Sequence, residues 1–184
     1  EEAIRGEDQG FDGIVSYCFA NPGVDACREA VNIPCLGSGE ASVALAATIG
    51  RRISIISILP NILPLIKRQN EEYIRMGKIV SVRYANLPVL DISSNEDFAL
   101  ESLYNEVIKS IKEDGADTIV LGCTGFAGFA QKIQNRLYEN GYSVCVVDPA
   151  GASLKMMEAL ITCNIKHSKI TYMKPIEKLM ILPK

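Results

Sequence analysis

The stretch Gly115-Ala-Asp-Thr-Ile-Val-Leu-Gly-Cys-Thr-Gly-Phe-Ala-Gly128 decides the fold, because an earlier segment repeats its residue types in the same order. The earlier segment is Gly10-Phe-Asp-Gly-Ile-Val-Ser-Tyr-Cys-Phe-Ala-Asn-Pro-Gly23. Each copy predicts a helix stop, a buried strand, a cysteine at the end of that strand and a turn into a helix. Aligned without a gap, the copies match Gly10 with Gly115, Asp12 with Asp117, Ile14-Val15 with Ile119-Val120, Cys18 with Cys123, and Gly23 with Gly128.

The repeat continues beyond the cysteines with looser spacing. A helical stretch follows each cysteine, then a short apolar strand at 33–36 or 144–147, then an Ala-Ser pair that opens another helix. We therefore expect an α/β fold of two pseudo-symmetric lobes, each a parallel sheet flanked by helices. The first lobe would combine residues 1–41 and 151–184, and the second would hold 42–150. Because parallel units place functional loops at the carboxyl ends of their strands, both cysteines should face one cleft.

Apolar periodicity and punctuation by Gly and Pro predict the remaining elements. Ser93 and Glu96 have capping-box spacing at the start of the most regular helix, which Gly115 ends. Turns or loops are expected at 37–40 and 85–93, and residues 170–173 could form a last strand. The other predicted helices are 1–9, 23–31, 41–49, 65–76, 128–139 and 152–163, and the predicted strands are 13–17, 33–36, 53–59, 79–84, 118–121 and 144–147.

Composition limits the classes of protein that this chain resembles. With 184 residues, 48% of them apolar, and a net charge of -3, it can bury a normal core. No apolar run approaches the roughly 18 to 20 residues that cross a bilayer, and no signal-peptide pattern opens the chain, so we expect no membrane partner and a cytoplasmic location. Basic residues do not outnumber acidic ones or form a stripe, which argues against a nucleic-acid partner.

The six cysteines do not have the settings of a disulfide or metal framework. Cys35 and Cys145 fall in apolar strands, and Cys27 and Cys163 fall in helical stretches, where free cysteines usually pack as small hydrophobes. No C-x-x-C pair occurs, and the single histidine, His167, lies in a polar stretch where we expect a solvated side chain. We therefore expect no metal site.

Cys18 and Cys123 are the candidate catalytic residues. A cysteine at the mouth of a helix feels the partial positive charge of unpaired N–H groups, which should favour the thiolate and lower the pKa. Backbone N–H groups of Phe19-Ala20 and Thr124-Gly125 lie beside the two sulfurs and could hold a developing oxyanion. A packing pair and a redox disulfide are the alternatives. A cysteine hydrolase is disfavoured, because its nucleophile needs a nearby histidine and His167 lies outside both repeat units.

Matched acid and base groups on opposite sides of a cleft suit a reaction that inverts a carbon atom. One thiolate would remove a proton from a carbon next to a carbonyl, and the opposing thiol would return a proton to the other face. The sequence has no motif for pyridoxal phosphate or a nicotinamide, and this chemistry needs no cofactor.

Three segments carry a resemblance to a known family. They are Cys18-Phe-Ala-Asn-Pro-Gly-Val-Asp-Ala26, Pro34-Cys-Leu-Gly-Ser-Gly-Glu-Ala-Ser42 and Val120-Leu-Gly-Cys-Thr-Gly-Phe126. These segments resemble the hydantoin racemase branch of the aspartate/glutamate/hydantoin racemase superfamily. The resemblance implies cofactor-independent racemisation of 5-monosubstituted hydantoins, or of the ureide allantoin, by Cys18 and Cys123. We further expect a small-molecule substrate and a homo-oligomer.

The residues after the first cysteine separate the branches of that superfamily. Amino-acid racemases follow it with Asn-Thr, whereas Phe19-Ala20 stand here and suit a cyclic, uncharged substrate. Asn21 and Phe126 stand where relatives commonly carry Asp and Met, which leaves the size and polarity of the pocket open. The candidate substrate-binding residues are Phe19, Ala20, Asn21, Ser57, Thr124, Gly125 and Phe126. A serine at a strand end, such as Ser57, can equally bond to backbone.

The resemblance does not include the start of the family's first lobe, and it leaves alternative functions open. The family places a strand-helix-strand unit before the point that corresponds to Glu1, so the first lobe is expected to lack that unit. An aspartate/glutamate-type racemase, or a maleate isomerase or arylmalonate decarboxylase activity, could use the same scaffold. A non-catalytic module that binds a small ligand in the cleft is a further alternative.

Overall fold

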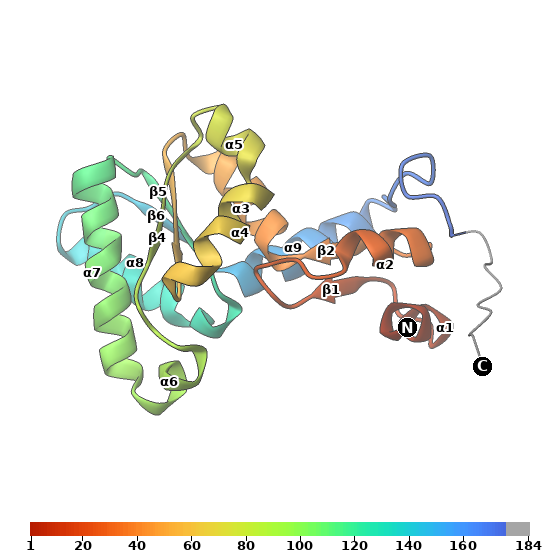
Figure 1. The fold of residues 1–184 in the computed structure, drawn as a ribbon, viewed down its shortest axis with the longest axis horizontal. Coiled ribbons are helices and arrows are strands. Elements are labelled where there is room, and N and C mark those ends of the chain that lie inside the picture. Colours follow the sequence, from red (N-terminus) through yellow and green to blue (C-terminus); the bar gives the residue numbers. More distant parts are fainter. Residues whose placement is uncertain (176–184) are drawn as a thin grey trace, which may run out of the picture.

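The strands form two parallel sheets in the computed structural model, which describes residues 1–175 (Figure 1). A two-stranded sheet pairs β1 (Ile14–Ser16) with β2 (Cys35–Gly37). A four-stranded sheet has the order β4-β3-β5-β6. Its strands are β3 (Ile53–Ser57), β4 (Ile79–Tyr84), β5 (Thr118–Leu121) and β6 (Cys145–Val147). All pairings are parallel, so the loops that follow the strands of one sheet share one edge.

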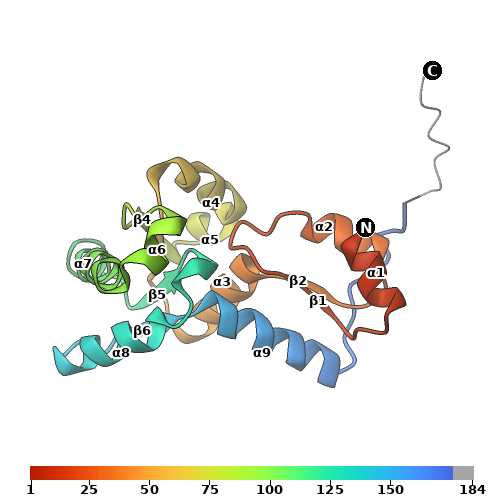
Figure 2. The same ribbon diagram turned by 90° about the horizontal axis from the view of Figure 1, so that it is seen from below.

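Helices flank both sheets, and two of them lie between the sheets. α3 and α9 pack against each other there, and α7 and α8 lie along the four-stranded sheet (Figures 1 and 2). The α-helices are α1 (Glu2–Asp8), α2 (Val24–Ala30), α3 (Ser38–Ile49), α4 (Leu63–Gln69), α5 (Glu71–Arg75), α6 (Val89–Ser94), α7 (Glu96–Asp114), α8 (Phe129–Glu139) and α9 (Pro149–Thr162). Short 3-10 helices cover Pro60–Ile62 and Thr124–Phe126.

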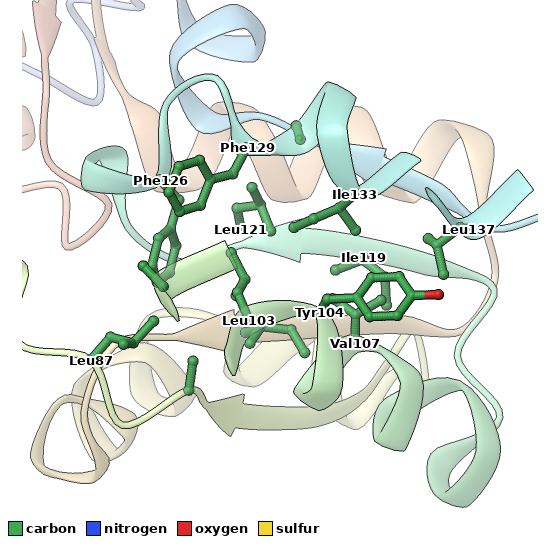
Figure 3. Packing of buried hydrophobic residues seen from close by; sticks show 14 of the residues in the cluster. Leu87, Leu103, Tyr104, Val107, Ile119, Leu121, Phe126, Phe129, Ile133 and Leu137 are labelled. Carbon is green, nitrogen blue, oxygen red and sulfur yellow. The ribbon is translucent and has the colours of Figure 1, made fainter. Parts of the chain in front are cut away.

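The largest core cluster lies between the four-stranded sheet and α7 and α8 (Figure 3). β3 and β5 are buried along their whole length, as expected for apolar strands in a parallel sheet with helices on both faces. α7 and α8 each contribute one apolar stripe to this core. The packing of these stripes against the sheet holds the carboxyl ends of β3 and β5 in place. Those stripes include Leu103, Tyr104 and Val107 of α7, and Phe129, Ile133 and Leu137 of α8.

The predicted α/β class with helix-flanked parallel sheets is confirmed, and the strands at 79–84 and 118–121 have the predicted bounds. The pseudo-symmetry of two lobes and their boundaries stay predictions. The proposed boundaries at 41/42 and 150/151 fall inside α3 and α9, which pack together. Residues 176–184, assigned to the first lobe, lie outside the described residues.

For three of the helices that begin away from their predicted starts, the capping partner of the first turn explains the difference. α3 begins at Ser38, inside the predicted turn, and the side chain of Asn21 from a distant loop accepts its N–H groups. α9 begins at Pro149 with Asp148 as its cap. α7 begins at Glu96, with Asn95 as its cap, which accepts the N–H of Phe98.

Three other segments differ from the prediction. The helix expected at 65–76 is broken at Asn70, whose side chain donates to the carbonyl of Ile66 and competes with the helical bonds. The second half of the expected loop at 85–93 is helical and belongs to α6, which the burial of Ile92 holds in place. Residues 170–173 contain a turn and a bend rather than a strand, and the hydroxyl of Tyr172 accepts a hydrogen bond from Arg28 of α2 instead.

The packing role predicted for four cysteines is only half right. Cys35 is buried and Cys27 half-buried, but Cys145 and Cys163 are exposed, because the outer face of β6 and the end of α9 are uncovered. His167 is not a free surface residue either: it is partly buried and accepts the N–H of Cys35 at 2.9 Å. Of the helices in residues 1–175, none has the length and apolarity needed to cross a membrane.

Candidate active site

Cys123 is placed by the end of β5. The N–H of Gly122 donates to the carbonyl of Ile56 on β3 at 2.8 Å, so the two strands stay paired up to the residue before the cysteine. A Cβ at Gly122 would lie only 3.1 Å from that carbonyl oxygen, a tight contact that favours glycine at this position. Cys123 then opens the 3-10 helix Thr124–Phe126, and its Sγ accepts the N–H of Gly125 at 3.3 Å.

The pKa of Cys123 is raised rather than lowered. Burial of the thiol is the largest cause, and the neighbouring Cys18 adds to it, while the N–H of Gly125 acts in the opposite direction. The sequence-based expectation considered only the N–H groups and missed the loss of solvation at this half-buried site. Cys123 is therefore a thiol at neutral pH, the form in which it donates a proton.

Cys18 is placed by the end of β1, in the other sheet. Its N–H donates to the carbonyl of Ser16 at 2.8 Å, and its carbonyl accepts the N–H of Asn21 at 3.0 Å, which closes a tight elbow. The side chain of Cys18 is exposed, in contrast to that of Cys123. The two elbows touch, since the hydroxyl of Thr124 donates to the carbonyl of Tyr17 at 3.4 Å.

Both cysteines line a single cavity of about 270 Å³. Five predicted substrate-binding residues line it as well: Phe19, Ala20, Ser57, Thr124 and Gly125. The remaining lining residues were not predicted from the sequence: Ile58, Ile62, Ile66, Val89 and Gly122. No charged side chain is among these lining residues.

Two predicted residues do not line this cavity. Phe126 is fully buried in the main core, with its ring 6.2 Å from that of Phe129 (Figure 3). The side chain of Asn21 turns away to cap α3. Ser57 does line the cavity, although its hydroxyl is completely buried and donates to the carbonyl of Gly122 at 3.3 Å.

The three isoleucines of the cavity had a recognisable signal in the sequence. Ile58, Ile62 and Ile66 recur every four residues, which is the spacing of one helix face. The prolines around them suggested a break in the chain, yet Pro60 lies in the first turn of the short helix Pro60–Ile62, where proline is tolerated. Val89 had no such signal, because α6 itself was predicted as a loop.

The described residues contain no group of three or more His, Cys, Asp or Glu side chains that could hold a metal ion. The cavity instead brings together two thiols, one exposed and one half-buried, in apolar surroundings. Such a pair can exchange protons with a carbon acid held between the sulfurs.

Comparison with known proteins assigns the chain to a family. The family model described as Asp/Glu/Hydantoin racemase matches residues 1–157. The hydantoin racemase of Pseudomonas sp. (strain NS671) is 32% identical over 179 residues, which cover 97% of this chain and 70% of that protein. The hydantoin racemase of Rhizobium meliloti is 37% identical over 175 residues, covering 95% of this chain and 70% of its own length.

A solved structure gives the same result. The allantoin racemase from Klebsiella pneumoniae superposes with a TM-score of 0.88 at 32% sequence identity, over 96% of this chain and 71% of that one. The match to the family model, the identities to two hydantoin racemases and this superposition agree on one assignment. The chain belongs to the Asp/Glu/hydantoin racemase family, and it is an isomerase of the racemase type.

Proposed function

We propose that the chain racemises a 5-monosubstituted hydantoin by proton transfer between Cys18 and Cys123. The observation that carries this proposal is the shared cavity, which has a thiol from each elbow and no charged side chain in its lining. The relatives named hydantoin racemase and allantoin racemase support the same substrate class.

The reaction needs only the two sulfurs. One thiolate takes the proton of the ring carbon C5, and the electron pair of the broken C–H bond moves into the neighbouring carbonyl as an enolate. The opposing thiol then donates its proton to the other face of C5, which inverts the carbon and leaves the second sulfur as the thiolate. Exchange of a proton with solvent restores the starting forms, and no metal or organic cofactor takes part.

The lining of the cavity favours a neutral ring over a free amino acid. An amino acid would bring an ammonium and a carboxylate into a space that offers no opposite charge, so the charges would lose their hydration without compensation. A hydantoin carries the same stereocentre without those charges, and a cavity of about 270 Å³ suits a small ring.

The same lining favours an apolar ring substituent over the ureido group of allantoin. Ile58, Ile62, Ile66 and Val89 form an apolar wall, and the hydroxyls of Ser57 and Thr124 already donate to carbonyls. Each unpaired polar group of a ureido substituent would cost about 1–3 kcal/mol on this wall. We expect 5-isobutylhydantoin to have a kcat/KM about tenfold or more above that of allantoin. Equal kcat/KM values for the two substrates would exclude the apolar wall as the determinant of substrate preference.

Solvent deuterium incorporation tests the mechanism. Enantiopure 5-isobutylhydantoin incubated with the protein in heavy water should gain deuterium at C5, above the rate of a protein-free control. Cys18→Ser and Cys123→Ser should each lower racemisation by about 10²–10⁴-fold. Each should also abolish exchange at one enantiomer only, because each sulfur serves one face. A protein that only binds the ring would give affinity without exchange, and this result would refute the proposal.

A further inference from the structure

The loop that carries Cys18 is attached to the start of α3. The backbone of Asn21 is left-handed, with φ of 51°, and its side-chain oxygen accepts the N–H groups of Gly39 at 2.8 Å and Glu40 at 3.3 Å. The N–H of Asn21 in turn donates to the carbonyl of Cys18. The contact is tight, since a Cβ at Gly39 would overlap the carbonyl oxygen of Phe19. The position of α3 therefore determines the position of the elbow.

The start of α3 is held by an ion pair. The carboxylate of Glu40 accepts the N–H of Gly37 at 2.8 Å and pairs with the guanidinium of Arg28 on α2. The side chain of Arg28 is only 9% exposed, and it also donates to the carbonyl of Cys35 at 3.2 Å and to Asp25 at 3.1 Å. One guanidinium thus links α2, β2 and α3 in a fixed geometry.

The segment after α9 covers this guanidinium. It runs back past the end of α2 and the start of β2, as both views of the ribbon show (Figures 1 and 2). The ring of Tyr172 lies 5.4 Å from Arg28, and Lys169 donates to the carbonyls of Arg28 and Val31. His167 accepts the N–H of Cys35. The three side chains are here called the strap. The ring of Tyr172 covers the guanidinium of Arg28, and a charge shielded from water in this way pairs more strongly with Glu40.

We propose that Arg28 and Glu40 are positioning residues for Cys18, and that the strap keeps their ion pair in place. Neither residue is among those lining the cavity of Cys18 and Cys123, so they act on the substrate through the elbow. The inference rests on the proposed racemase function. A shift of about 1 Å in a catalytic group can lower a rate on the order of 10²-fold, so a structural link of this kind has kinetic consequences.

The variant Glu40→Gln tests the proposal, because its amide oxygen can still accept the N–H of Gly37 while the charge that pairs with Arg28 is lost. Exchange into each enantiomer of 5-isobutylhydantoin is measured separately, and Cys18→Ser identifies the enantiomer that Cys18 serves. We expect Glu40→Gln to slow exchange at that enantiomer by about 10- to 100-fold. Exchange at the other enantiomer should stay within about twofold of wild type, and KM should change by less than about threefold, because the apolar wall of Ile58, Ile62, Ile66 and Val89 lies outside the elbow.

The control is Asp114→Asn, which breaks another arginine–carboxylate pair, that with Arg83 on β4, and neither of these two residues lines the cavity. It should leave exchange at both enantiomers unchanged. Tyr172→Leu, at the strap, should reproduce the one-sided loss of Glu40→Gln at a smaller size and supplies the test if Glu40→Gln does not fold. An equal loss at both enantiomers, or no loss in either variant, would overturn the positioning role.

A readout without substrate separates this proposal from the proposed function. If wild type shows no exchange with any hydantoin, the proposed function fails, and the rates at which iodoacetamide labels the two cysteines still decide the inference. A changed rate at Cys18 with an unchanged rate at Cys123 in Glu40→Gln supports positioning. Unchanged rates at both cysteines refute it.

Discussion

Cys18 and Cys123 follow strands of different sheets, β1 and β5, yet both line one cavity, and the hydroxyl of Thr124 bonds the second elbow to the residue before Cys18. The two thiols differ in their surroundings, since Cys18 is exposed and Cys123 is half-buried. This asymmetry within a matched pair leads to the first prediction.

Iodoacetamide should label Cys18 faster than Cys123 at pH 7. Burial raises the pKa of Cys123 above its usual 9.0, so only a small fraction of this side chain is thiolate at pH 7. Because the side chain is half-buried, the reagent also has restricted access to its sulfur. Raising the pH toward 9 should accelerate labelling of Cys123. Peptide mass spectrometry after timed pulses measures both rates, and the exposed Cys163 serves as an internal reference. Faster labelling of Cys123 than of Cys18 at pH 7 would contradict the prediction.

Ser57→Ala should lower stability more than it affects substrate binding. The hydroxyl of Ser57 is completely buried and donates to the carbonyl of Gly122, so its removal leaves that bond unmade and costs about 1 kcal/mol. KM should change by less than about twofold. Urea denaturation and steady-state kinetics measure the two effects. The matched control is Ser54→Ala on the same strand, β3, which removes a hydroxyl–hydroxyl bond to Ser81 on β4. A large rise in KM for Ser57→Ala alone would make Ser57 a substrate contact.

Asp117→Asn should destabilise the protein, whereas Asp12→Asn, at the matching position of the repeat, should not. The carboxylate of Asp117 accepts the N–H groups of Arg51 and Arg52 at 3.0–3.1 Å, while Asp12 is exposed. Burial alone would raise the pKa of Asp117, but the bonds from the two N–H groups stabilise the carboxylate more strongly, so the pKa is lowered. Its contribution is therefore present at neutral pH and is lost as the pH falls through the lowered pKa.

The loss in Asp117→Asn is expected to be about 1–2 kcal/mol at pH 7, measured by urea denaturation. The difference between this variant and wild type should shrink at low pH, where the wild-type carboxylate is protonated. Equal stability losses in Asp117→Asn and Asp12→Asn would show that the bonds to Arg51 and Arg52 contribute nothing.

His167→Gln should make stability less dependent on pH. Burial is the largest cause that lowers the pKa of His167 below 6.5, and the positive charge of Arg28 lowers it further. The charge of Glu40 raises this pKa and that of Lys169 lowers it, and the ring of Tyr172 packs edge-on against the imidazole. The unfolded chain then binds this proton more readily than the folded chain, so stability falls as the pH drops from about 6.5 through the lowered pKa. A protonated ring has no lone pair left to accept the N–H of Cys35.

Glutamine can still accept that N–H through its side-chain oxygen but does not titrate. Wild type should therefore lose more free energy of unfolding between pH 7.5 and pH 5.5 than His167→Gln does, as measured by urea denaturation at both values. Parallel losses in the two proteins would show that His167 does not titrate differently in the folded state. Carboxylates titrate mainly below this window and affect both proteins alike.

The sequence by itself determined the α/β class, the parallel strands and the two elbows with their cysteines. These features depend on local chemistry. Apolar runs such as 53–59 and 118–121 are too short for helices and too apolar for exposed strands, and a gap-free repeat indicates two copies of one strand-to-helix turn. Of the nine candidate site residues, the two cysteines and five others line one cavity, and only the contact between the elbows brings them together. The other two, Asn21 and Phe126, do not line it.

Tertiary structure alone decided everything that depends on a distant partner. Asn21 caps a helix that begins 17 residues later, which no local pattern encodes, and so the start of α3 could not be predicted. Burial of Cys123 reversed the direction expected for its pKa, because solvation depends on which segments cover the thiol. The bond between His167 and Cys35, 132 residues apart, also depends on packing between distant segments. The environment of a side chain is set by such packing, whereas strands, turns and the positions of the cysteines follow from residues that are neighbours in the sequence.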